Sequence, residues 1–335
     1  MAMRAPEFWY SDPNESVAFV LKPLGWIYGF VGRTRASMTV PFRASVPVIC
    51  VGNLTAGGTG KTPLAMAIGE MLKARNLRVA FLSRGYGADV PGAMVVDAAQ
   101  DSAADVGDEP LMLAQRAMAI VSPDRPAGAR LAISRGAQVI VMDDGFQNPS
   151  LKKDLSFVVV DAAKGFGNGC IIPAGPLRER IEDGLARAQA VIAMGEGHVS
   201  LPVDTALLHA ELVPLAEDAA RLKGQRVLAF AGIGDPKKFF ATLEACGAIV
   251  EWRKEFPDHY AYNEEDIGDL KEMAQRYDAI PVTTEKDYLR LQPSLRSGIN
   301  TLRVVAQFDP QSTLLIDQFI DKCLTQFQPP PHAKH

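Results

Sequence analysis

The stretch Thr55-Ala56-Gly57-Gly58-Thr59-Gly60-Lys61-Thr62 decides the fold class of this chain. An apolar run at residues 46–51 precedes it and another at 64–72 follows it, so the order is strand, glycine-rich loop, helix. Such a loop points its backbone N–H groups inward, while Lys61 reaches the β- and γ-phosphates and the Thr62 hydroxyl ligates Mg²⁺. The positive end of the helix dipole adds to the same site. The stretch predicts a loop that binds a nucleoside triphosphate.

One position departs from the strict pattern G-x-x-x-x-G-K-[ST], because Thr55 stands where the first glycine belongs. A glycine-rich turn without a ligand is the alternative interpretation. The flanking strand and helix are the context that the motif requires, so they favour phosphate binding.

Composition indicates a globular protein of about two typical domain lengths, with 335 residues, 47% hydrophobic and 22% charged. The formal net charge of -4 gives no reason to expect nucleic-acid binding. The four cysteines are far apart and form no C-x-x-C pair, which suggests neither a zinc site nor a disulfide framework. A reducing cytosolic compartment is the simplest interpretation.

The N-terminal region carries a nearly continuous apolar run at residues 17–30, which includes Trp26 and Tyr28. Lys22 and Pro23 interrupt it, whereas a bilayer-spanning helix needs about 20 predominantly apolar residues. Acidic residues occupy the part that a signal peptide keeps basic. Two interpretations stay open, an interfacial segment on an anionic membrane surface and a helix packed on its own protein.

From residue 46 onward, short β-branched runs alternate with helical stretches, as in a parallel sheet covered by helices. We expect strands at 48–52, 79–83, 119–122, 139–143, 157–161 and 190–194, with helices at 63–75, 110–117 and 177–188. A second series of strands is expected near 227–231, 249–252, 280–283 and 302–305. The predicted fold class is α/β, a P-loop NTPase-type doubly wound, mainly parallel sheet with a second smaller α/β lobe and an N-terminal membrane-associated helix.

Four segments follow from this pattern. Residues 1–45 form an N-terminal amphipathic, interfacial segment, 46–215 a P-loop nucleotide-binding kinase domain, 216–327 a C-terminal α/β lobe, and 328–335 a disordered tail. The lobe boundary is placed around 213–224, where the periodic pattern weakens.

Two carboxylate pairs stand out. Asp143 and Asp144 end an apolar strand beside the phosphate loop, the usual source of a Walker-B group for Mg²⁺, although they also fit the start of a turn. Asp108 and Glu109 lie in Gly107-Asp108-Glu109-Pro110, where helix capping is the favoured interpretation from the motif alone.

Two loops carry a guanidinium and a histidine stands in a third. Arg84, followed by Tyr86, ends a predicted strand and suits an anionic ligand, with a salt-bridged surface turn as the alternative. Arg178 lies at a predicted helix start after Pro173-Ala174-Gly175-Pro176, which suits a phosphate, with a loop that simply starts a helix as the alternative. His259 lies between Asp258 and Tyr260. A surface or hydrogen-bonding role is the favoured interpretation, and a catalytic or substrate-orienting role is the alternative.

Together these segments resemble the tetraacyldisaccharide 4'-kinases of lipid A biosynthesis in Gram-negative bacteria. The blocks that carry the resemblance are Phe8-Trp9-Tyr10, residues 51–63, Ser83-Arg84-Gly85-Tyr86-Gly87, Gly107-Asp108-Glu109-Pro110, Asp143-Asp144-Gly145-Phe146-Gln147, residues 173–179, Asp258-His259-Tyr260 and Thr284-Glu285-Lys286-Asp287. Members of that family carry the same form of phosphate loop, without its first glycine.

The resemblance implies transfer of the ATP γ-phosphoryl group to the 4'-hydroxyl of tetraacyldisaccharide 1-phosphate, which yields lipid IV-A. It implies a peripheral protein on the cytoplasmic face of the inner membrane, with a lipid substrate, no nucleic acid and no obligate protein partner. The acyl chains stay in the bilayer, which favours the interfacial interpretation of the N-terminal segment.

The resemblance also implies roles for individual residues. Lys61 and the loop amides hold the phosphates, and Asp108 is the base that takes the acceptor proton, assisted by His259. The residues expected near Mg²⁺ are Thr62, Glu109, Asp143 and Asp144. The residues expected to contact phosphates, the base and metal groups or the sugar are Arg84, Tyr86, Gln147 and Arg178.

Two other classes stay open. A membrane-associated P-loop ATPase switch of the partition or cell-division type has a similar loop, but Ala56 stands where those proteins have their signature lysine. A GTP-binding regulator needs an N-K-x-D segment, whereas Lys286 and Asp287 are adjacent here.

Overall fold

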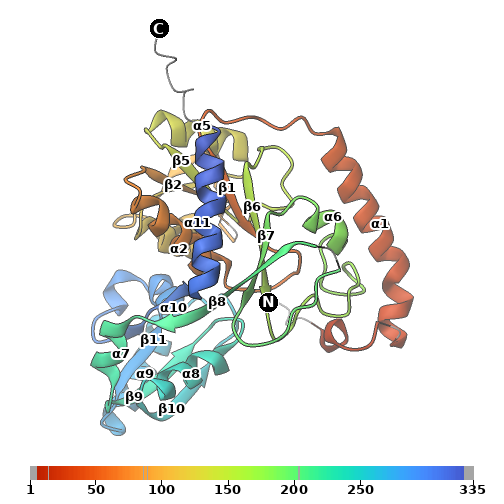
Figure 1. Cartoon of the computed structure of the whole chain (residues 1–335). Helices are drawn as coiled ribbons and strands as arrows, with labels where there is room; N and C mark the ends of the chain where they lie inside the picture. The colour runs from red at the N-terminus through yellow and green to blue at the C-terminus, as the bar shows by residue number, and fades with distance from the viewer. Residues whose placement is uncertain (1–5, 14, 86, 89, 203, 328–335) are drawn as a thin grey trace.

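The computed structural model describes residues 6–13, 15–85, 87–88, 90–202 and 204–327, so Tyr86 and the tail at 328–335 lie outside it. Its main feature is a nine-stranded sheet in the order β13-β8-β7-β6-β1-β5-β2-β4-β3 (Figure 1). The strands are β1 (Val48–Gly52), β2 (Val79–Ser83), β3 (Met94–Val95), β4 (Met118–Val121), β5 (Val139–Asp143), β6 (Leu155–Asp161), β7 (Ala190–Met194), β8 (Ala206–Pro214) and β13 (Val304–Phe308). Only β3 and β13 pair antiparallel in it, so the predicted mainly parallel sheet is confirmed.

Helices cover both faces of this sheet. The first face packs on α2 (Lys61–Lys73), α3 (Ala103–Val106), α4 (Asp108–Ala114) and α11 (Pro310–Thr325), and the second on α5 (Arg125–Ser134) and α6 (Ile181–Leu185). Each face is apolar because successive residues of a strand point to opposite sides, so Ile49 joins the first core and Cys50 the second. The doubly wound prediction is thereby confirmed.

A smaller parallel sheet forms the second lobe, in the order β10-β9-β11-β12. Its strands are β9 (Arg226–Ala231), β10 (Ile249–Glu255), β11 (Ile280–Thr284) and β12 (Asn300–Leu302). The helices of this lobe are α7 (Ala216–Leu222), α8 (Pro236–Ala245), α9 (Glu264–Arg276) and α10 (Glu285–Arg290), with a 3-10 turn at Pro293–Leu295.

The chain returns to the large sheet at its C-terminal end, which the expected segment 216–327 did not anticipate. The single strand expected at 302–305 is two strands, β12 in the small sheet and β13 in the large one. Arg303 separates them, and its guanidinium Nε donates to Asp218 Oδ2 at 2.8 Å. β13 then pairs with β8, and α11 packs against the large sheet beside α2.

The helix expected at 177–188 is also shorter, since α6 spans Ile181–Leu185. Leu177 is instead tied into the loop layer, where its N–H donates to Cys170 O at 3.1 Å and its carbonyl accepts from Ile172 N at 2.8 Å. The Arg178 N–H donates to Leu54 O at 2.7 Å, beside the phosphate loop. These hydrogen bonds hold residues 177 and 178 in the loop, so the helix begins only at Ile181 although the sequence pattern predicts an earlier start.

The N-terminal helix α1 (Ser16–Met38) stands at the edge of the large lobe, after a 3-10 turn at Glu7–Tyr10 (Figure 1). Gly25 and Gly29 let it approach Ile171, where an added Cβ at Gly25 would lie 2.7 Å from the Ile171 carbonyl oxygen. Arg33 adds an ion pair to Asp183 at 2.6 Å. One side of α1 therefore contacts the body of the protein.

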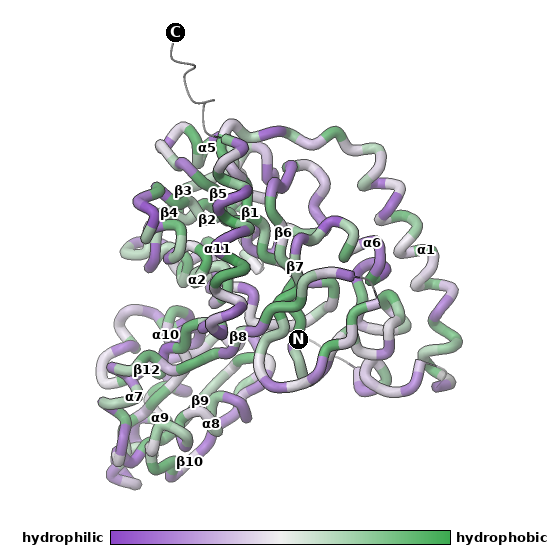
Figure 2. Tube along the Cα trace, in the orientation of Figure 1, coloured by the Kyte–Doolittle hydropathy of each residue, from purple (hydrophilic) through white to green (hydrophobic). Residues whose placement is uncertain are grey.

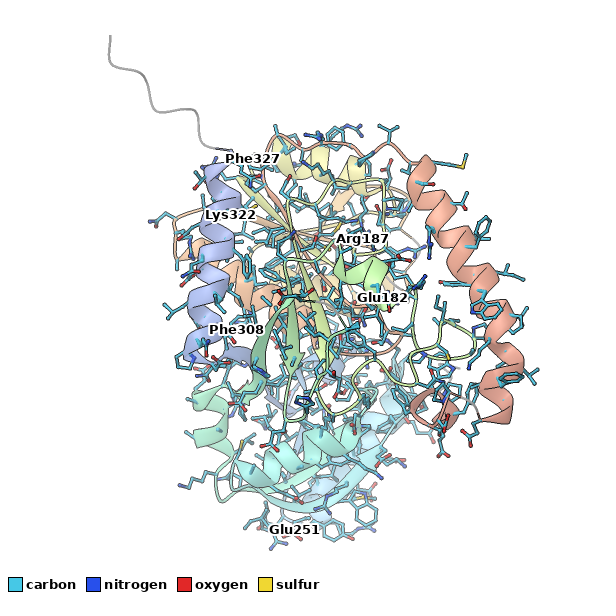
Figure 3. The ribbon with its side chains drawn as sticks, turned by 45° about the vertical axis from the view of Figure 1, so that its right-hand side comes forward. Glu182, Arg187, Glu251, Phe308, Lys322 and Phe327 are labelled. Atoms are coloured by element: carbon cyan, nitrogen blue, oxygen red, sulfur yellow. The ribbon has the colours of Figure 1, made fainter. Side chains whose placement is uncertain are left out.

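The other sides of α1 are apolar and exposed. Trp26 and Phe30 are each 70% exposed, and Figure 2 shows hydrophobic positions along the helix. Figure 3, in which α1 comes forward, shows its side chains standing clear of the body. No helix in the described part of the chain is long and apolar enough to span a bilayer.

Candidate active site

The phosphate loop connects β1 to α2 and is shaped by hydrogen bonds. Asn53 Nδ2 donates to the Thr55 carbonyl at 2.7 Å, and the Ala56 N–H donates to the Pro176 carbonyl at 2.8 Å. Gly60 has a φ of 81° and precedes the first residue of α2, a backbone conformation that only glycine adopts readily. Of the sequence-predicted residues, 55–60 thus form the loop, and Lys61 and Thr62 are the first two residues of the 13-residue helix α2.

The inner part of this loop has room for a ligand. A Cβ added at Gly57 or Gly58 would meet no atom within 4 Å. The Thr59 hydroxyl is buried and has no hydrogen-bond partner among the described residues. Lys61 is half-buried at the start of α2, where its charge acts on Asp143 and Asp144.

Thr62 and Asp143 meet beside the loop. The Thr62 hydroxyl donates to Asp143 Oδ2 at 2.9 Å. β1 and β5 are neighbouring strands and Val51 pairs with Asp143, so the end of β5 lies beside the loop that leads from β1 to Thr62. Asp143 is 1% exposed, and its Oδ1 has no hydrogen-bond partner among the described residues. Burial, with the charge of Glu109 added, raises the pKa of Asp143 to about 7. A buried carboxylate with an unpaired oxygen is suited to a cation.

Asp144 belongs to a different group of side chains. It has a φ of 50° and accepts a hydrogen bond from Arg178 Nη1 at 3.2 Å. Gln147 lies in the same group, since its Nε2 donates to the Asn53 carbonyl at 2.8 Å and to Glu179 at 3.1 Å. Burial alone would raise the pKa of Asp144, yet Lys61 and Arg178 hold it below its ordinary value. The structure therefore joins Asp144, Gln147 and Arg178, as neighbours of the loop.

Arg84 directly follows β2 and is exposed, and among the described residues it makes no hydrogen bond or ion pair to Asp144, Gln147 or Arg178. The charge of Arg84 acts on Arg125, a buried guanidinium that donates to the Ser122 carbonyl at 2.6 Å. Burial, together with the charge of Arg84, lowers the pKa of Arg125 to about 10. Arg125 carried no signal in the sequence, and Tyr86 lies outside the described residues.

Asp108 and His259 come together from the two lobes. Asp108 is the first residue of α4 and is 5% exposed, and Gly107, with a φ of 93°, takes the N-cap position. His259 stands in a loop of the small lobe with a φ of 58°. Its Nδ1 lies 3.4 Å from Asp108 Oδ2. Because Gly107 is the N-cap residue, the capping interpretation of Asp108 is wrong. The Asp108 side chain lies at the junction of the lobes, while its Oδ1 accepts the Glu109 N–H at 2.9 Å.

Two cations of α10 also reach this place, and sequence reasoning gave neither a role. Lys286 Nζ lies 3.1 Å from Glu109 Oε1, and Arg290 donates through Nε to Asp108 Oδ2 at 3.0 Å. Burial alone would raise the pKa of Asp108, but a hydrogen bond from His259 and the charges of Lys286 and Arg290 hold it well below its usual range. Asp108 is a carboxylate at neutral pH.

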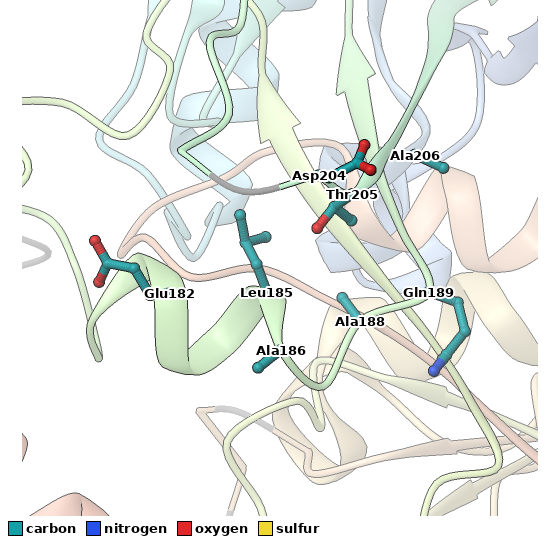
Figure 4. A pocket seen from close by; sticks show the side chains of 8 residues that line it. All are labelled: Glu182, Leu185, Ala186, Ala188, Gln189, Asp204, Thr205 and Ala206. Atoms are coloured by element: carbon teal, nitrogen blue, oxygen red, sulfur yellow. The ribbon is translucent and has the colours of Figure 1, made fainter.

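The phosphate loop follows β1, Asp143 ends β5 and Arg84 follows β2, so these groups lie at the carboxyl-terminal edge of the large sheet. A separate hollow of about 420 Å³ lies at the opposite edge, where β7 and β8 begin, and is lined by residues such as Leu185, Gln189 and Ala206 (Figure 4). Ligands of open α/β sheets bind outside the carboxyl ends of the strands. The phosphate loop edge, not this hollow, is the candidate active site.

Comparisons with known proteins all match one family. The family model for tetraacyldisaccharide-1-P 4'-kinase matches residues 17–323. A tetraacyldisaccharide 4'-kinase from Rhodospirillum centenum is 49% identical over 323 residues, covering 93% of this chain and 95% of the relative. One from Rhodospirillum rubrum is 49% identical over 330 residues, covering 96% and 98%. A crystal structure of LpxK from Aquifex aeolicus in complex with ATP superimposes with a TM-score of 0.76 at 26% identity, covering 92% of this chain and 99% of that one.

Proposed function

This chain belongs to the tetraacyldisaccharide-1-P 4'-kinase family, and we propose that its two lobes transfer a phosphoryl group from Mg²⁺-ATP to a lipid held at a membrane surface. It is an ATP-dependent kinase of lipid A biosynthesis, which phosphorylates the 4'-hydroxyl of tetraacyldisaccharide 1-phosphate and forms lipid IV-A. Membership of this family excludes the two alternative classes, the partition-type ATPase switch and the GTP-binding regulator.

The observation that carries the proposed mechanism is the buried pair of Thr62 and Asp143 beside the loop. Mg²⁺ keeps several waters and takes one or two protein carboxylates together with substrate phosphates. Among the described residues, no group of three or more His, Cys, Asp or Glu side chains is arranged to hold a metal, so a sparse site of this kind suits the chain. Thr62 and Asp143 would hold the ion, which neutralises charge on the transferred phosphoryl group.

The other residues divide the remaining work. The loop amides and Lys61 bind the β- and γ-phosphates, and Asp108 accepts the proton of the 4'-hydroxyl as His259 orients it. Glu109 and Asp144 lie near the metal site, but Glu109 pairs with Lys286 and Asp144 with Arg178. We therefore assign them an indirect role, in which they do not ligate the ion themselves. Arg84, Gln147 and Arg178 are assigned to the anionic and sugar groups of the substrates.

Phosphoryl transfer in mixed detergent micelles tests this mechanism. With γ-labelled ATP, Mg²⁺ and tetraacyldisaccharide 1-phosphate, we expect label in a bisphosphorylated lipid. Chelating Mg²⁺ with EDTA is expected to lower the initial rate by at least about 10²-fold, because the phosphate charges then lack their counterion. Restoring Mg²⁺ should restore the rate. A rate that survives chelation would contradict the metal role of Thr62 and Asp143.

We further propose that α1 lies on the cytoplasmic face of the inner membrane, as a peripheral anchor. Support comes from the exposed apolar side chains of α1 and from Arg35 near its C-terminal end, which suits anionic headgroups. A lipid substrate whose acyl chains stay in the bilayer requires the site to work beside that surface.

Replacing Trp26 and Phe30 with serine is expected to lower binding to anionic phospholipid vesicles about tenfold or more. Each exposed ring loses the free energy of leaving water, roughly 1.5–3 kcal/mol for full burial. Co-sedimentation with vesicles measures the effect. Leu314→Ser, which removes a 64% exposed side chain from α11, is the matched control and should bind as the unmodified protein does. Equal binding by the double variant would argue against α1 as the anchor.

A further inference from the structure

Arg290 is the most completely bonded cation at the junction of the two lobes. Its side chain is 6% exposed although it comes from α10 of the small lobe. On the large-lobe side, Nε and Nη2 both donate to Asp108 Oδ2. On the small-lobe side, Nη1 donates to the Gly232 carbonyl at 2.6 Å and to Asp287 Oδ1 at 2.8 Å.

Asp287 fixes this guanidinium from behind. It is fully buried, and its carboxylate accepts hydrogen bonds from the Gly232 N–H at 3.1 Å, the Tyr262 hydroxyl at 3.0 Å and the Thr284 hydroxyl at 2.7 Å. A buried carboxylate with this many donors has one orientation. The Arg290 guanidinium is therefore held in one orientation by buried groups of the small lobe.

The same guanidinium contacts both groups assigned to proton transfer. Arg290 Nη2 lies 3.2 Å from His259 Nδ1, which itself lies 3.4 Å from Asp108 Oδ2. The tautomer of His259 decides whether Nδ1 accepts from Arg290 or donates to Asp108 Oδ2. With Oδ2 occupied by Arg290, Asp108 Oδ1 accepts only the Glu109 N–H, at 2.9 Å, among the described residues. One oxygen of the carboxylate is bound and the other retains a lone pair.

We infer that Arg290 is a positioning residue, which orients Asp108 from the opposite lobe so that Oδ1 meets the acceptor hydroxyl. The inference rests on the proposed role of Asp108 as the base. The two hydrogen bonds from Arg290 to Asp108 Oδ2 restrict rotation of the Asp108 carboxylate. Asp287 holds Arg290 on the small lobe, so the orientation of the carboxylate depends on where the small lobe lies. Arg290 itself touches neither substrate, and it acts through Asp108 and His259.

A double-mutant cycle separates this role from a purely structural one. The variants are Arg290→Met, Asp108→Ala and the double variant, with the transfer of label to lipid as readout. We expect Arg290→Met to lower kcat about 10- to 100-fold, with the KM for ATP changed less than threefold. In the Asp108→Ala background, the same substitution should cause no further loss, because the group that it positions is gone. Arg290→Lys should recover part of the rate, since it keeps the charge.

Arg296→Met is the matched control, because within the described residues the contacts of Arg296 stay in the same lobe, with the backbone carbonyls of Leu289 and Leu291 and the ring of Tyr288. It should change kcat less than twofold. ATP binding by each variant reports whether the large lobe is folded, and if Arg290→Met does not bind ATP, Arg290→Lys and Asp287→Asn complete the cycle. Losses that multiply in the double variant, or an unchanged kcat for Arg290→Met, would overturn this inference alone. Full activity of Asp108→Ala would instead overturn the base assignment, and the inference with it.

Discussion

The Lys61→Ala variant is expected to lose about 10³-fold or more in kcat/KM for phosphoryl transfer. Lys61 is the cation at the first residue of α2, and its charge acts on Asp143 and Asp144. Without it, the carboxylates and the phosphates repel each other, and the charge that develops during transfer loses a preorganised partner. The measurement is the initial rate of lipid labelling at subsaturating ATP, together with the Kd for ATP.

Lys73→Ala is the control for that variant. Lys73 lies on the same helix but is paired with Glu70 at the surface, 3.0 Å apart. Surface pairs contribute little to stability, so this variant should match the unmodified protein. A Lys61→Ala enzyme within tenfold of the unmodified rate would contradict the phosphate-binding role of the loop lysine.

The Asp108→Ala variant is expected to lose about 10²- to 10⁴-fold in kcat, the usual contribution of a positioned general base. Its Kd for ATP should change little, because within the described part of the chain Asp108 makes no hydrogen bond or ion pair to residues 55–62. The loss leaves buried Arg290 without one of its two carboxylate partners, so the variant should also melt at a lower temperature. Rates are therefore compared below the melting transition, after thermal denaturation of each protein has been measured.

A neighbouring carboxylate provides the control. Asp105 lies in the capping box at the start of α3, where its carboxylate accepts from the Ser102 N–H at 3.0 Å. Asp105→Ala removes a negative charge three residues from Asp108 and touches no group of the site. It should retain kcat within about twofold. If both variants lose activity equally, the loss in Asp108→Ala comes from removing a negative charge in this region, and Asp108 is not the base.

The sequence predicts the large lobe well because the signals there are local. The phosphate loop, the strand before it and the two carboxylates of β5 each follow from a few adjacent residues, and β1, β2, β5 and β7 have the predicted bounds. Asp143 beside Thr62 follows from the rule that parallel strands end at the same edge.

The junction of the lobes was not predictable in the same way. Arg290 reaches Asp108 across 182 residues of sequence, and nothing in its own neighbours shows that it is buried. Lys286 stood in a block that supported the resemblance, but its pairing with Glu109 depends on how α10 packs against α4. The return of β13 likewise depends on pairing with β8, which only the three-dimensional structure shows.

That return has a consequence for motion. β8 leaves the large sheet at Pro214, and β13 re-enters it at Val304, directly opposite in the register. The small lobe is thus an insertion at the tip of a two-stranded ribbon, with both crossings side by side. A body held by two adjacent strands swings about a single hinge axis and does not slide. Opening and closing should therefore move Arg290, Lys286 and His259 toward or away from Asp108 as one unit.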